Sequence, residues 1–460
     1  VRGTLERLPP NLAVMRNVNF GFQVQGWLPP GTEVEPEAAS LLTVLNPIDY
    51  HPAADGSVTG IPTEIATAGN FAIAPTIVAG TEDEISALNA ILGSGPLTAA
   101  HIDAIIALVE QGDYAGIDLD YRELDPSLGS QFTEFITALA ARLHEQQRTL
   151  TITLPLPVRD SESWDTGPFD WTQLGETVDR IKIPTPDDQS IYAARMDDVL
   201  TFLTEQAPPS KMLLIVSPYS YVRVGEEITP VQLAEALSLA TPVQIAEDES
   251  ALVTGGTVTL VGTNLYRENN ATGLQWDDTA NMVTFAYQEG DTPTTVWLEN
   301  QYSIGFKLQL VTRHRLGGIA VLDVSSNGLK ANIWPPIRGM VEGGSLNLLK
   351  PNEQLLQPTW QIVDPNGQPV PDTALDGGMS GAVQWQIPAT PGTYVVTLIV
   401  SDGTIRVGQE AQLLVAEGSA PSDAATAPAD QPPDAADAPV DEPTLVPGDG
   451  GEPADTAVAE

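Results

Sequence analysis

The chain has 460 residues, with 61 Asp and Glu against 20 Lys and Arg, so its formal net charge is −41, and it contains no cysteine. Such an acidic chain repels phosphate backbones and anionic lipid surfaces, which excludes nucleic acid and membrane surfaces as expected partners. Without cysteine there is no disulfide, thiolate metal site or thiol nucleophile. The histidines lie far apart and lack metal-ligand spacing. Neither a metal nor any other cofactor is therefore predicted.

Residues 1–9 form a lead-in that begins Val1-Arg2-Gly3, without an initiator methionine or an apolar signal region. We therefore expect that this chain is a processed product or a fragment, from which a targeting segment was removed. No stretch approaches the ~18 consecutive apolar residues of a membrane-spanning helix. Any membrane association is expected to need an anchor outside this chain.

Residues 10–332 alternate apolar segments with amphipathic ones, and an insertion is expected around residues 229–300. Two segments, His101–Glu110 and Phe132–Glu145, place their apolar side chains on one helical face. Eight strands separated mostly by helices favour the α/β class and a (β/α)8 TIM barrel, with functional side chains at the carboxyl ends of the strands. An open doubly wound sheet is the alternative, although no glycine-rich phosphate loop follows the first strand. The predicted strands are Val18–Gln25, Leu41–Leu45, Phe71–Val78, Gly116–Tyr121, Leu150–Leu154, Asp179–Ile183, Met212–Val216 and Gly318–Val324.

Residues 333–416 hold short segments of alternating polarity between turn sequences such as Asp364-Pro365-Asn366-Gly367. Period-two alternation predicts a small all-β sandwich. Residues 391–403, PGTYVVTLIVSDG, resemble a strand of immunoglobulin-like or PKD-like modules of bacterial surface proteins, which implies an accessory role more than independent ligand binding. The predicted strands are Ser345–Leu348, Thr359–Val363, Ala382–Ile387 and Thr393–Val400.

Residues 417–460 contain eleven Asp or Glu, eight prolines, no Lys or Arg, and only four Leu, Ile, Val or Phe residues. So little apolar surface cannot offset the entropy lost on ordering, which predicts a disordered acidic tail. A passive solvating tail is favoured over a spacer that leads to an anchor. The resemblance of residues 391–403 to modules of bacterial surface proteins implies a bacterial protein of the extracellular space or cell envelope.

The segment 113–124 is the most informative, because its acidic residues alternate with Ile and Leu. In a strand, Asp118, Asp120 and Arg122 share one face, while Glu123 points to the other. A charge inside a barrel is costly unless it is paired or functional. The trio is interpreted as a paired charge cluster or as part of a site, and a β-bulge at Tyr121 or Arg122 would be needed to turn Glu123 inward.

Residues 115–122, Ala-Gly-Ile-Asp-Leu-Asp-Tyr-Arg, resemble the signature Asp-Gly-x-Asp-x-Asp-x-Glu of family 18 glycoside hydrolases, the chitinase-like group. Further matches at 42–58, 295–307 and 316–321 extend the resemblance over about residues 10–332. It implies that the last signature residue is the general acid and that the preceding Asp orients the N-acetyl group of the substrate, outside the usual two-carboxylate scheme. Here these positions hold Arg122 and Asp120. Since arginine stays protonated, Arg122 cannot serve as the acid.

Two other positions depart from the family pattern. The sixth strand usually ends Met-x-Tyr-Asp, but this chain has Pro184-Thr185-Pro186-Asp187 and retains only the Asp. The last strand usually carries a Trp that forms the floor of the sugar subsite, and the aligned residue is Leu322. Together with Arg122, these changes favour the loss of hydrolysis.

Aromatic residues at predicted strand ends and loops are candidates for stacking on sugar rings, although most such rings in proteins serve packing. The predicted substrate-binding residues are Trp27, Tyr50, Tyr121, Arg122, Asp187, Tyr219 and Tyr221, and Trp164 and Trp171 are further candidates from the same aromatic set.

The leading hypothesis is an extracellular protein that holds an N-acetylhexosamine-containing glycan, such as chitin or peptidoglycan, without cleaving it efficiently; it rests partly on analogy. The second is an active, retaining, substrate-assisted glycosidase with Asp118, Asp120 and Glu123 as its catalytic residues. The third is a structural surface protein whose barrel is only a scaffold.

Overall fold

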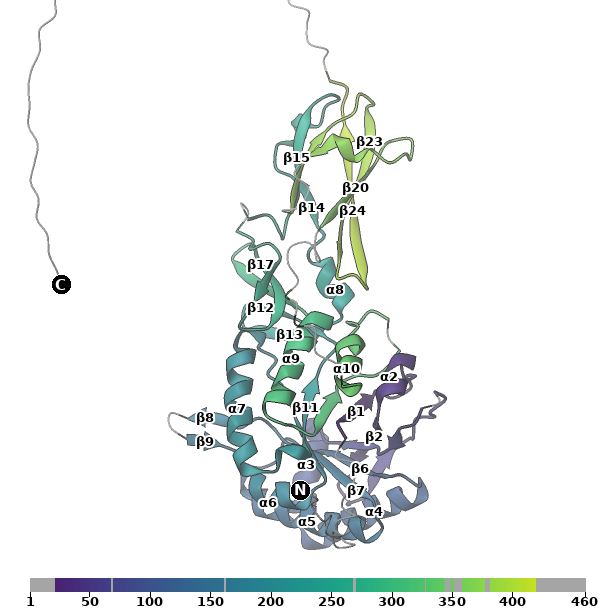
Figure 1. The fold of residues 1–460 in the computed structure, drawn as a ribbon, viewed down its shortest axis with the longest axis vertical. Helices are drawn as coiled ribbons and strands as arrows, with labels where there is room; N and C mark the ends of the chain where they lie inside the picture. Colours follow the sequence, from purple (N-terminus) through teal and green to yellow (C-terminus); the bar gives the residue numbers. More distant parts are fainter. Residues whose placement is uncertain are drawn as a thin grey trace, which may run out of the picture. The chain divides into compact units, whose positions relative to one another are not determined.

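The computed structural model describes residues 21–67, 69–160, 163–267, 270–326, 328–343, 348, 350, 358–376 and 381–418 (Figure 1). The predicted lead-in over residues 1–9, most of the predicted strand Ser345–Leu348, and the predicted tail beyond Gly418 lie outside these residues.

Eight parallel strands close into a barrel, because β1 pairs with β19 on one side and with β2 on the other. This closure confirms the predicted (β/α)8 barrel and rules out the open doubly wound sheet. In the order of their pairing, the barrel strands are β1 (Gln23–Leu28), β19 (Gly318–Val321), β11 (Met212–Val216), β10 (Arg180–Ile183), β7 (Thr149–Thr153), β6 (Gly116–Asp120), β5 (Thr76–Val78) and β2 (Val44–Pro52).

Each of the eight predicted strands overlaps a barrel strand, but several ends differ. Of the predicted strand Val18–Gln25, residues 18–20 lie outside the described residues, and β1 begins at Gln23. The predicted strand Leu41–Leu45 begins only at Val44, because Leu41 ends the short helix α2 (Pro36–Leu41). The predicted strand Phe71–Val78 is divided into β4 (Ala72–Ile73) and β5. Pro75 lies between these two segments and has no N–H to donate to a neighbouring strand. Two short hairpin strands, β8 (Val158–Asp160) and β9 (Ser163–Asp165), follow β7, and β3 (Val58–Gly60) pairs with β2.

Helices cover the outside of the barrel, and their apolar faces form its main core. The two predicted helices are confirmed within α4 (Gly95–Gln111) and α5 (Gly129–Glu145), where Ile105, Val109, Leu139 and Leu143 are fully buried. Among the described residues, no single helix is long and apolar enough to cross a bilayer; α3 and α4 satisfy that test only together, across a bend of 113°. The remaining helices are α3 (Glu82–Leu92), α6 (Trp171–Thr177), α7 (Tyr192–Gln206), α9 (Gln301–Arg313) and α10 (Trp334–Val341).

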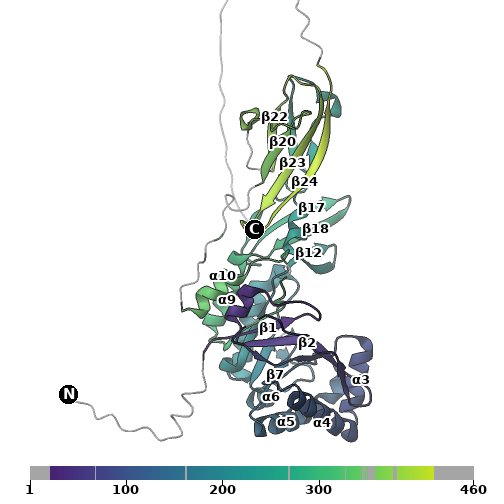
Figure 2. The same ribbon diagram turned by 90° about the vertical axis from the view of Figure 1, so that its right-hand side faces the viewer.

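An antiparallel sheet is inserted between β11 and α9. It begins at Ser220, soon after the end of β11, so the insertion starts earlier than the expected position around residue 229. Figure 2 shows β12, β17 and β18 side by side in this sheet. The sheet order is β13 (Glu227–Val231), β12 (Ser220–Val224), β18 (Thr292–Leu298), β17 (Met282–Glu289) and β16 (Gln275–Asp277), and the insertion also holds helix α8 (Leu233–Ser238).

The same insertion supplies two strands to the β-sandwich. Strand β15 (Thr257–Gly262) pairs with β14 (Val243–Ile245) and with β22 (Ala382–Gln386), more than a hundred residues away in the chain. Val258 and Leu260 share one apolar core with Trp385 and Tyr394. The predicted sequence range 333–416 therefore omits part of the sandwich, since period-two alternation identifies a strand but not its partner. The other sandwich strands are β21 (Leu375–Asp376), β20 (Thr359–Val363), β23 (Gly392–Ser401) and β24 (Arg406–Val415).

The substitution Trp385→Ala tests the shared core, because Trp385 is fully buried between strands from both parts of the chain. We expect a loss of about 3–5 kcal/mol in the free energy of unfolding of the sandwich, as for other buried Trp to Ala changes. Hydrogen exchange should accelerate in residues 257–262 as well as in residues 392–401. Leu414→Ala, at a position that is 71% exposed on β24, is the control and should change stability by less than about 0.5 kcal/mol. Unchanged exchange in residues 257–262 of the Trp385 variant would contradict the shared core.

Candidate active site

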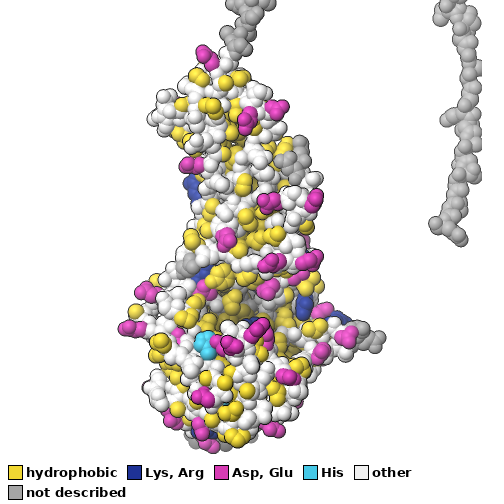
Figure 3. Space-filling model, turned by 180° about the vertical axis from the view of Figure 1, so that it is seen from behind, with side chains coloured by type: hydrophobic (Ala, Val, Ile, Leu, Met, Phe, Trp, Pro, Cys, Tyr) yellow, Lys and Arg dark blue, Asp and Glu magenta, His cyan; other side chains and the backbone are white. Residues whose placement is uncertain are grey.

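A pocket of about 360 Å³ lies where the carboxyl ends of four neighbouring barrel strands meet. Figure 3 shows a hollow on one side of the barrel, with acidic and basic side chains at its border. In a TIM barrel this end of the strands carries the functional loops. The pocket is lined by Val78, Ala79 and Gly80 at the end of β5, Asp120, Arg122 and Glu123 at the end of β6, Pro155 and Leu156 after β7, and Pro184, Thr185, Pro186 and Asp187 after β10.

Asp120 and Arg122 form a bidentate ion pair in this pocket. The Arg122 Nε donates to Asp120 Oδ1 at 2.6 Å, and Nη2 donates to Oδ2 at 3.0 Å. Asp120 is only 8% exposed, whereas Arg122 is exposed. Burial raises the pKa of the Asp120 carboxyl above its usual value, although the Arg122 guanidinium acts in the opposite direction. The two parallel hydrogen bonds therefore fix the carboxylate and the guanidinium relative to one another.

Asp118 lies deeper, inside the barrel, and is fully buried. Its Oδ2 accepts hydrogen bonds from Trp27 Nε1 at 2.8 Å, Thr76 Oγ1 at 2.7 Å and Lys182 Nζ at 2.8 Å. Lys182 also donates to Asn46 Oδ1 at 3.0 Å, and its ammonium lies 4.1 Å from the centre of the Trp27 ring. Burial lowers the pKa of Lys182 despite the neighbouring Asp118 carboxylate. Asp118 is thus compensated by a cation that does not line the pocket.

Lys182 was missed as a site residue by the sequence interpretation, although a signal for it exists. Arg180-Ile181-Lys182-Ile183 alternates charged with apolar residues in a predicted strand, as residues 117–120 do. The reasoning that singled out Asp118 applies equally to Lys182, because a buried charge in a barrel strand requires a partner. The two strands are separated by β7 in the sheet, so the long lysine side chain spans that distance.

Glu123 lines the same pocket as Asp120, contrary to the expectation from strand alternation. Strand β6 ends at Asp120, so the alternation of faces no longer applies at residue 123 and no bulge is needed. The Glu123 side chain is exposed and makes no hydrogen bond or ion pair within the described part of the chain. Asp187 also lines the pocket and is exposed. Of the three predicted catalytic residues, the structure brings Asp120 and Glu123 to the pocket and places Asp118 behind it.

Residues 80–327, more than half of the chain, match the sequence profile of the glycosyl hydrolases family 18. The chain belongs to this family. A curated relative, the uncharacterized glycosylase YvbX of Bacillus subtilis, is 18% identical over 249 residues, which cover 51% of this chain and 64% of YvbX. The chain therefore spans less than two thirds of that relative.

Solved structures of similar fold include two that are named for their activities. The spore cortex-lytic enzyme SleL of Bacillus megaterium has a TM-score of 0.55 and 18% identity, covering 72% of this chain and 76% of SleL. A chitinase from Chromobacterium violaceum has a TM-score of 0.53 and 17% identity, covering 69% of this chain and 98% of the chitinase. At these identities the likeness concerns the fold.

None of the five aromatic rings predicted to bind sugar lines the pocket of this family 18 barrel. Tyr121 is 1% exposed, and its hydroxyl lies 2.9 Å from His101 Nε2 in the helix layer. The Tyr50 hydroxyl lies 3.2 Å from that of Tyr114, and Trp27 is held by Asp118 inside the barrel. Trp27, Tyr50 and Tyr121 therefore do not line this pocket, and their contact with substrate stays a prediction. Large rings near strand ends were needed to fill the core instead.

The other predicted rings have different surroundings. Tyr219 donates a hydrogen bond to Asp323 Oδ2 at 2.5 Å, after the last barrel strand, and Asp323 also pairs with Lys330 at 2.9 Å. Tyr221 is buried in the inserted sheet against Met282 and Trp297. Neither tyrosine lines the pocket, and their predicted contact with substrate stays a prediction.

Two tryptophans named from the sequence also lie elsewhere. Trp164, on the β8–β9 hairpin, stacks on Phe202 with ring centres 5.2 Å apart and lines a separate surface pocket of α7. Trp171 is buried in the main core. In the described ranges, no group of three or more His, Asp or Glu side chains is placed to hold a metal ion.

Lys182→Met is expected to destabilise the barrel by about 3–5 kcal/mol, because it leaves the buried Asp118 carboxylate without its cation. The double variant Lys182→Met with Asp118→Asn should recover part of this loss, since no charge is then buried. Urea unfolding measures both. Arg142→Met, which breaks the exposed ion pair with Asp103, is the control and should cost less than about 1 kcal/mol. If Lys182→Met were no more harmful than this control, the barrel interior would not depend on the pair.

Proposed function

We propose that this family 18 protein binds N-acetylhexosamine-containing glycans, chitin-like or peptidoglycan-like, in the pocket at the end of the barrel and does not hydrolyse them efficiently. The observation that carries the proposal is the Arg122–Asp120 pair. At the position where the family resemblance places the general acid, the chain has a guanidinium that is permanently charged and already bonded to the adjacent signature aspartate.

Loss of hydrolysis follows from proton chemistry. A general acid must hold a proton near neutral pH and release it to the glycosidic oxygen in the transition state. Arginine does not release its proton at such pH. Asp120 is bonded to Arg122 through both carboxylate oxygens, and Asp118 is bonded to Lys182 away from the pocket. Neither aspartate is therefore free to take over the acid's role.

Retention of binding is supported by the pocket itself. Its volume falls within the range of small-molecule sites, which combine apolar walls with a few polar groups. Pro155 and Leu156 supply apolar surface, while Arg122, Glu123 and Asp187 supply charged groups able to hydrogen-bond sugar hydroxyls and amides. The structural neighbours named as chitinase and as spore cortex-lytic enzyme make chitin and peptidoglycan the two glycans to compare.

We also propose that the protein acts outside the cell or in the cell envelope of a bacterium. The support is the polymeric, extracellular nature of the proposed glycans and the additional β-sandwich, which is expected to be immunoglobulin-like. Fractionation of the native host, with detection of this chain in medium, envelope and cytosol, tests this proposal; recovery in the cytosol alone would reject it.

A glycan array that includes chitooligosaccharides and peptidoglycan fragments is the first test of binding. We expect the wild-type chain to bind at least one of these glycans, and Leu156→Trp, which fills the pocket, to weaken that binding at least tenfold. Leu414→Trp adds the same bulk at an exposed sandwich position and is the control that should bind normally. If the wild type bound no glycan, the proposal would fail and the interpretation as a structural scaffold would be favoured.

Hydrolysis by Glu123 is the second candidate function, because this unpaired carboxylate lines the pocket beside Asp120. The test is release of the fluorophore from a fluorogenic chitooligosaccharide by wild type and Glu123→Gln. We expect neither protein to exceed the buffer rate, since Glu123 is exposed and lies one residue beyond the acid's position in the family pattern. Wild-type hydrolysis that disappears in Glu123→Gln would establish the glycosidase and reject a binding-only role.

A further inference from the structure

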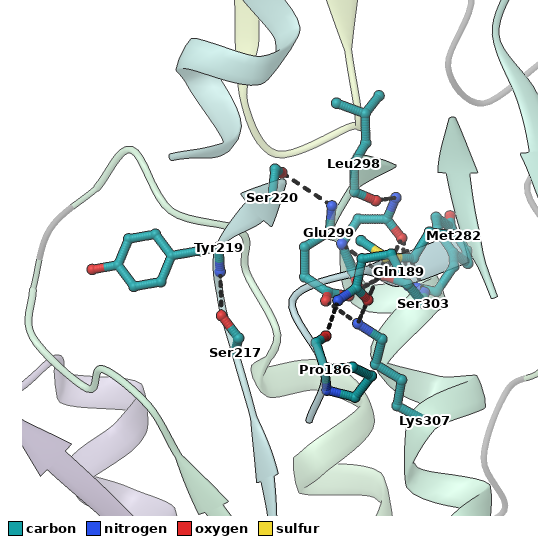
Figure 4. Close-up of polar contacts among 12 residues, drawn as sticks. Pro186, Gln189, Ser217, Tyr219, Ser220, Met282, Leu298, Glu299, Ser303 and Lys307 are labelled. Carbon is teal, nitrogen blue, oxygen red and sulfur yellow. Dashed lines mark hydrogen bonds and ion pairs between the residues drawn. The ribbon is translucent and has the colours of Figure 1, made fainter. Parts of the chain in front are cut away.

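The segment 184–187 after β10 forms one wall of the pocket. The side chain of Gln189, which does not line the pocket, is hydrogen-bonded to the backbone of this wall. Gln189 is fully buried, and its Nε2 donates to the carbonyl oxygen of Pro186 at 2.7 Å and to that of Asp187 at 3.3 Å. Figure 4 shows the Gln189 amide between Pro186 and the side chain of Lys307. Proline in this segment cannot donate through its nitrogen, so its carbonyls are the groups that a neighbour can hold.

Behind Gln189 lies a buried ion pair. Lys307 Nζ donates to Gln189 Oε1 at 3.2 Å and to Glu299 Oε2 at 2.5 Å. Lys307 is 4% exposed and Glu299 is fully buried, so this pair is removed from solvent. The Lys307 ammonium also lies 4.7 Å from the centre of the Tyr192 ring. Breaking such a pair leaves an uncompensated charge in the core, so its members hold one another firmly in place.

The ion pair is in turn fixed to the inserted sheet and to α9. The Glu299 backbone N–H donates to Ser220 Oγ at 3.0 Å, and Glu299 accepts a hydrogen bond from the Ser303 hydroxyl. The sulfur of Met282, on β17, lies 3.6 Å from Lys307 Nζ. Ser220 and Met282 belong to strands of the insertion, so the insertion is linked to the pocket wall through Lys307 and Gln189.

The chemistry of this position requires an amide. The side chain must donate to two carbonyl oxygens on one side and accept from an ammonium on the other, and a glutamine amide offers both functions. A carboxylate would lack the donor, and an apolar side chain would lack both. A buried network of this kind holds its members rigidly when every group is satisfied.

We propose that Gln189 is a positioning residue of the pocket, which fixes the wall that carries Asp187. Because Gln189 is in turn held by Lys307 and Glu299, the inserted sheet influences the affinity of the pocket for glycan. The part that concerns affinity rests on the proposed function. Gln189 does not itself line the pocket, and its side chain reaches the lining residues Pro186 and Asp187 only at their backbone oxygens, so any effect on binding acts through the wall.

The test uses Gln189→Met in the full chain, with two readouts. We expect about tenfold weaker binding of chitotetraose by calorimetry, and faster hydrogen exchange of the amides in residues 184–188 of the free protein. The double variant Lys307→Met with Glu299→Gln removes the anchor without leaving a lone buried charge. It should show the same faster exchange and a loss of affinity of about threefold, although neither residue lines the pocket.

The control is a core variant on α5, either Ile136→Val or Leu139→Ala, chosen to match the loss of melting temperature of Gln189→Met. It should leave both affinity and exchange in residues 184–188 unchanged, which separates positioning from general destabilisation. Binding by Gln189→Met within twofold of wild type, with unchanged exchange in this segment, would overturn the inference. If the wild type does not bind glycan, the proposed function and the affinity effect fail together, while the exchange rates still decide whether Gln189 fixes the wall.

Discussion

The buried pair of Asp118 and Lys182 is the interaction on which the interior of this barrel depends. Closing eight strands into a barrel leaves an interior that side chains must fill, and here one layer is filled by charged and polar groups rather than by branched aliphatic ones. A carboxylate without solvent contact is tolerated only when its charge is compensated. Lys182 supplies that compensation. Trp27 and Thr76 donate to the same Asp118 Oδ2, and Asn46 accepts from Lys182, whereas Asp118 Oδ1 has no hydrogen-bond partner among the described residues.

The second cation, Arg122, has a comparable effect at the surface of the same site. Together the two cations neutralise both aspartates that the chain shares with the family signature, one inside the barrel and one at the pocket. The pocket retains its shape and hydrogen-bonding groups, and both signature aspartates present in this chain are paired with a cation. This pairing, together with an arginine at the position of the family's acid, is the physical basis for the proposal that the pocket binds glycan without cleaving it efficiently.

The insertion links parts of the molecule that the chain order separates. It contributes β14 and β15 to the sandwich, and it fastens the pocket wall through Glu299, Lys307 and Gln189. A segment that would ordinarily be regarded as an embellishment between β11 and α9 thus contributes to two structural units. Since both contributions are made by buried groups, the insertion is part of the folded core rather than a surface addition.

The sequence by itself determined the alternation of strands and helices, because eight apolar segments and two amphipathic helices have periods that follow from local geometry; this favoured the barrel without excluding the open sheet. It also determined the importance of residues 118–122, because charges in a strand demand partners. It could not show that Arg122 pairs with Asp120 while Lys182 pairs with Asp118, or that Tyr50, Tyr121 and Tyr221 fill cores. It could not show that β15 pairs with β22 or that Gln189 supports Asp187. Those facts were decided only by the tertiary structure, since pairing, burial and the end of a strand depend on which distant segments meet in space.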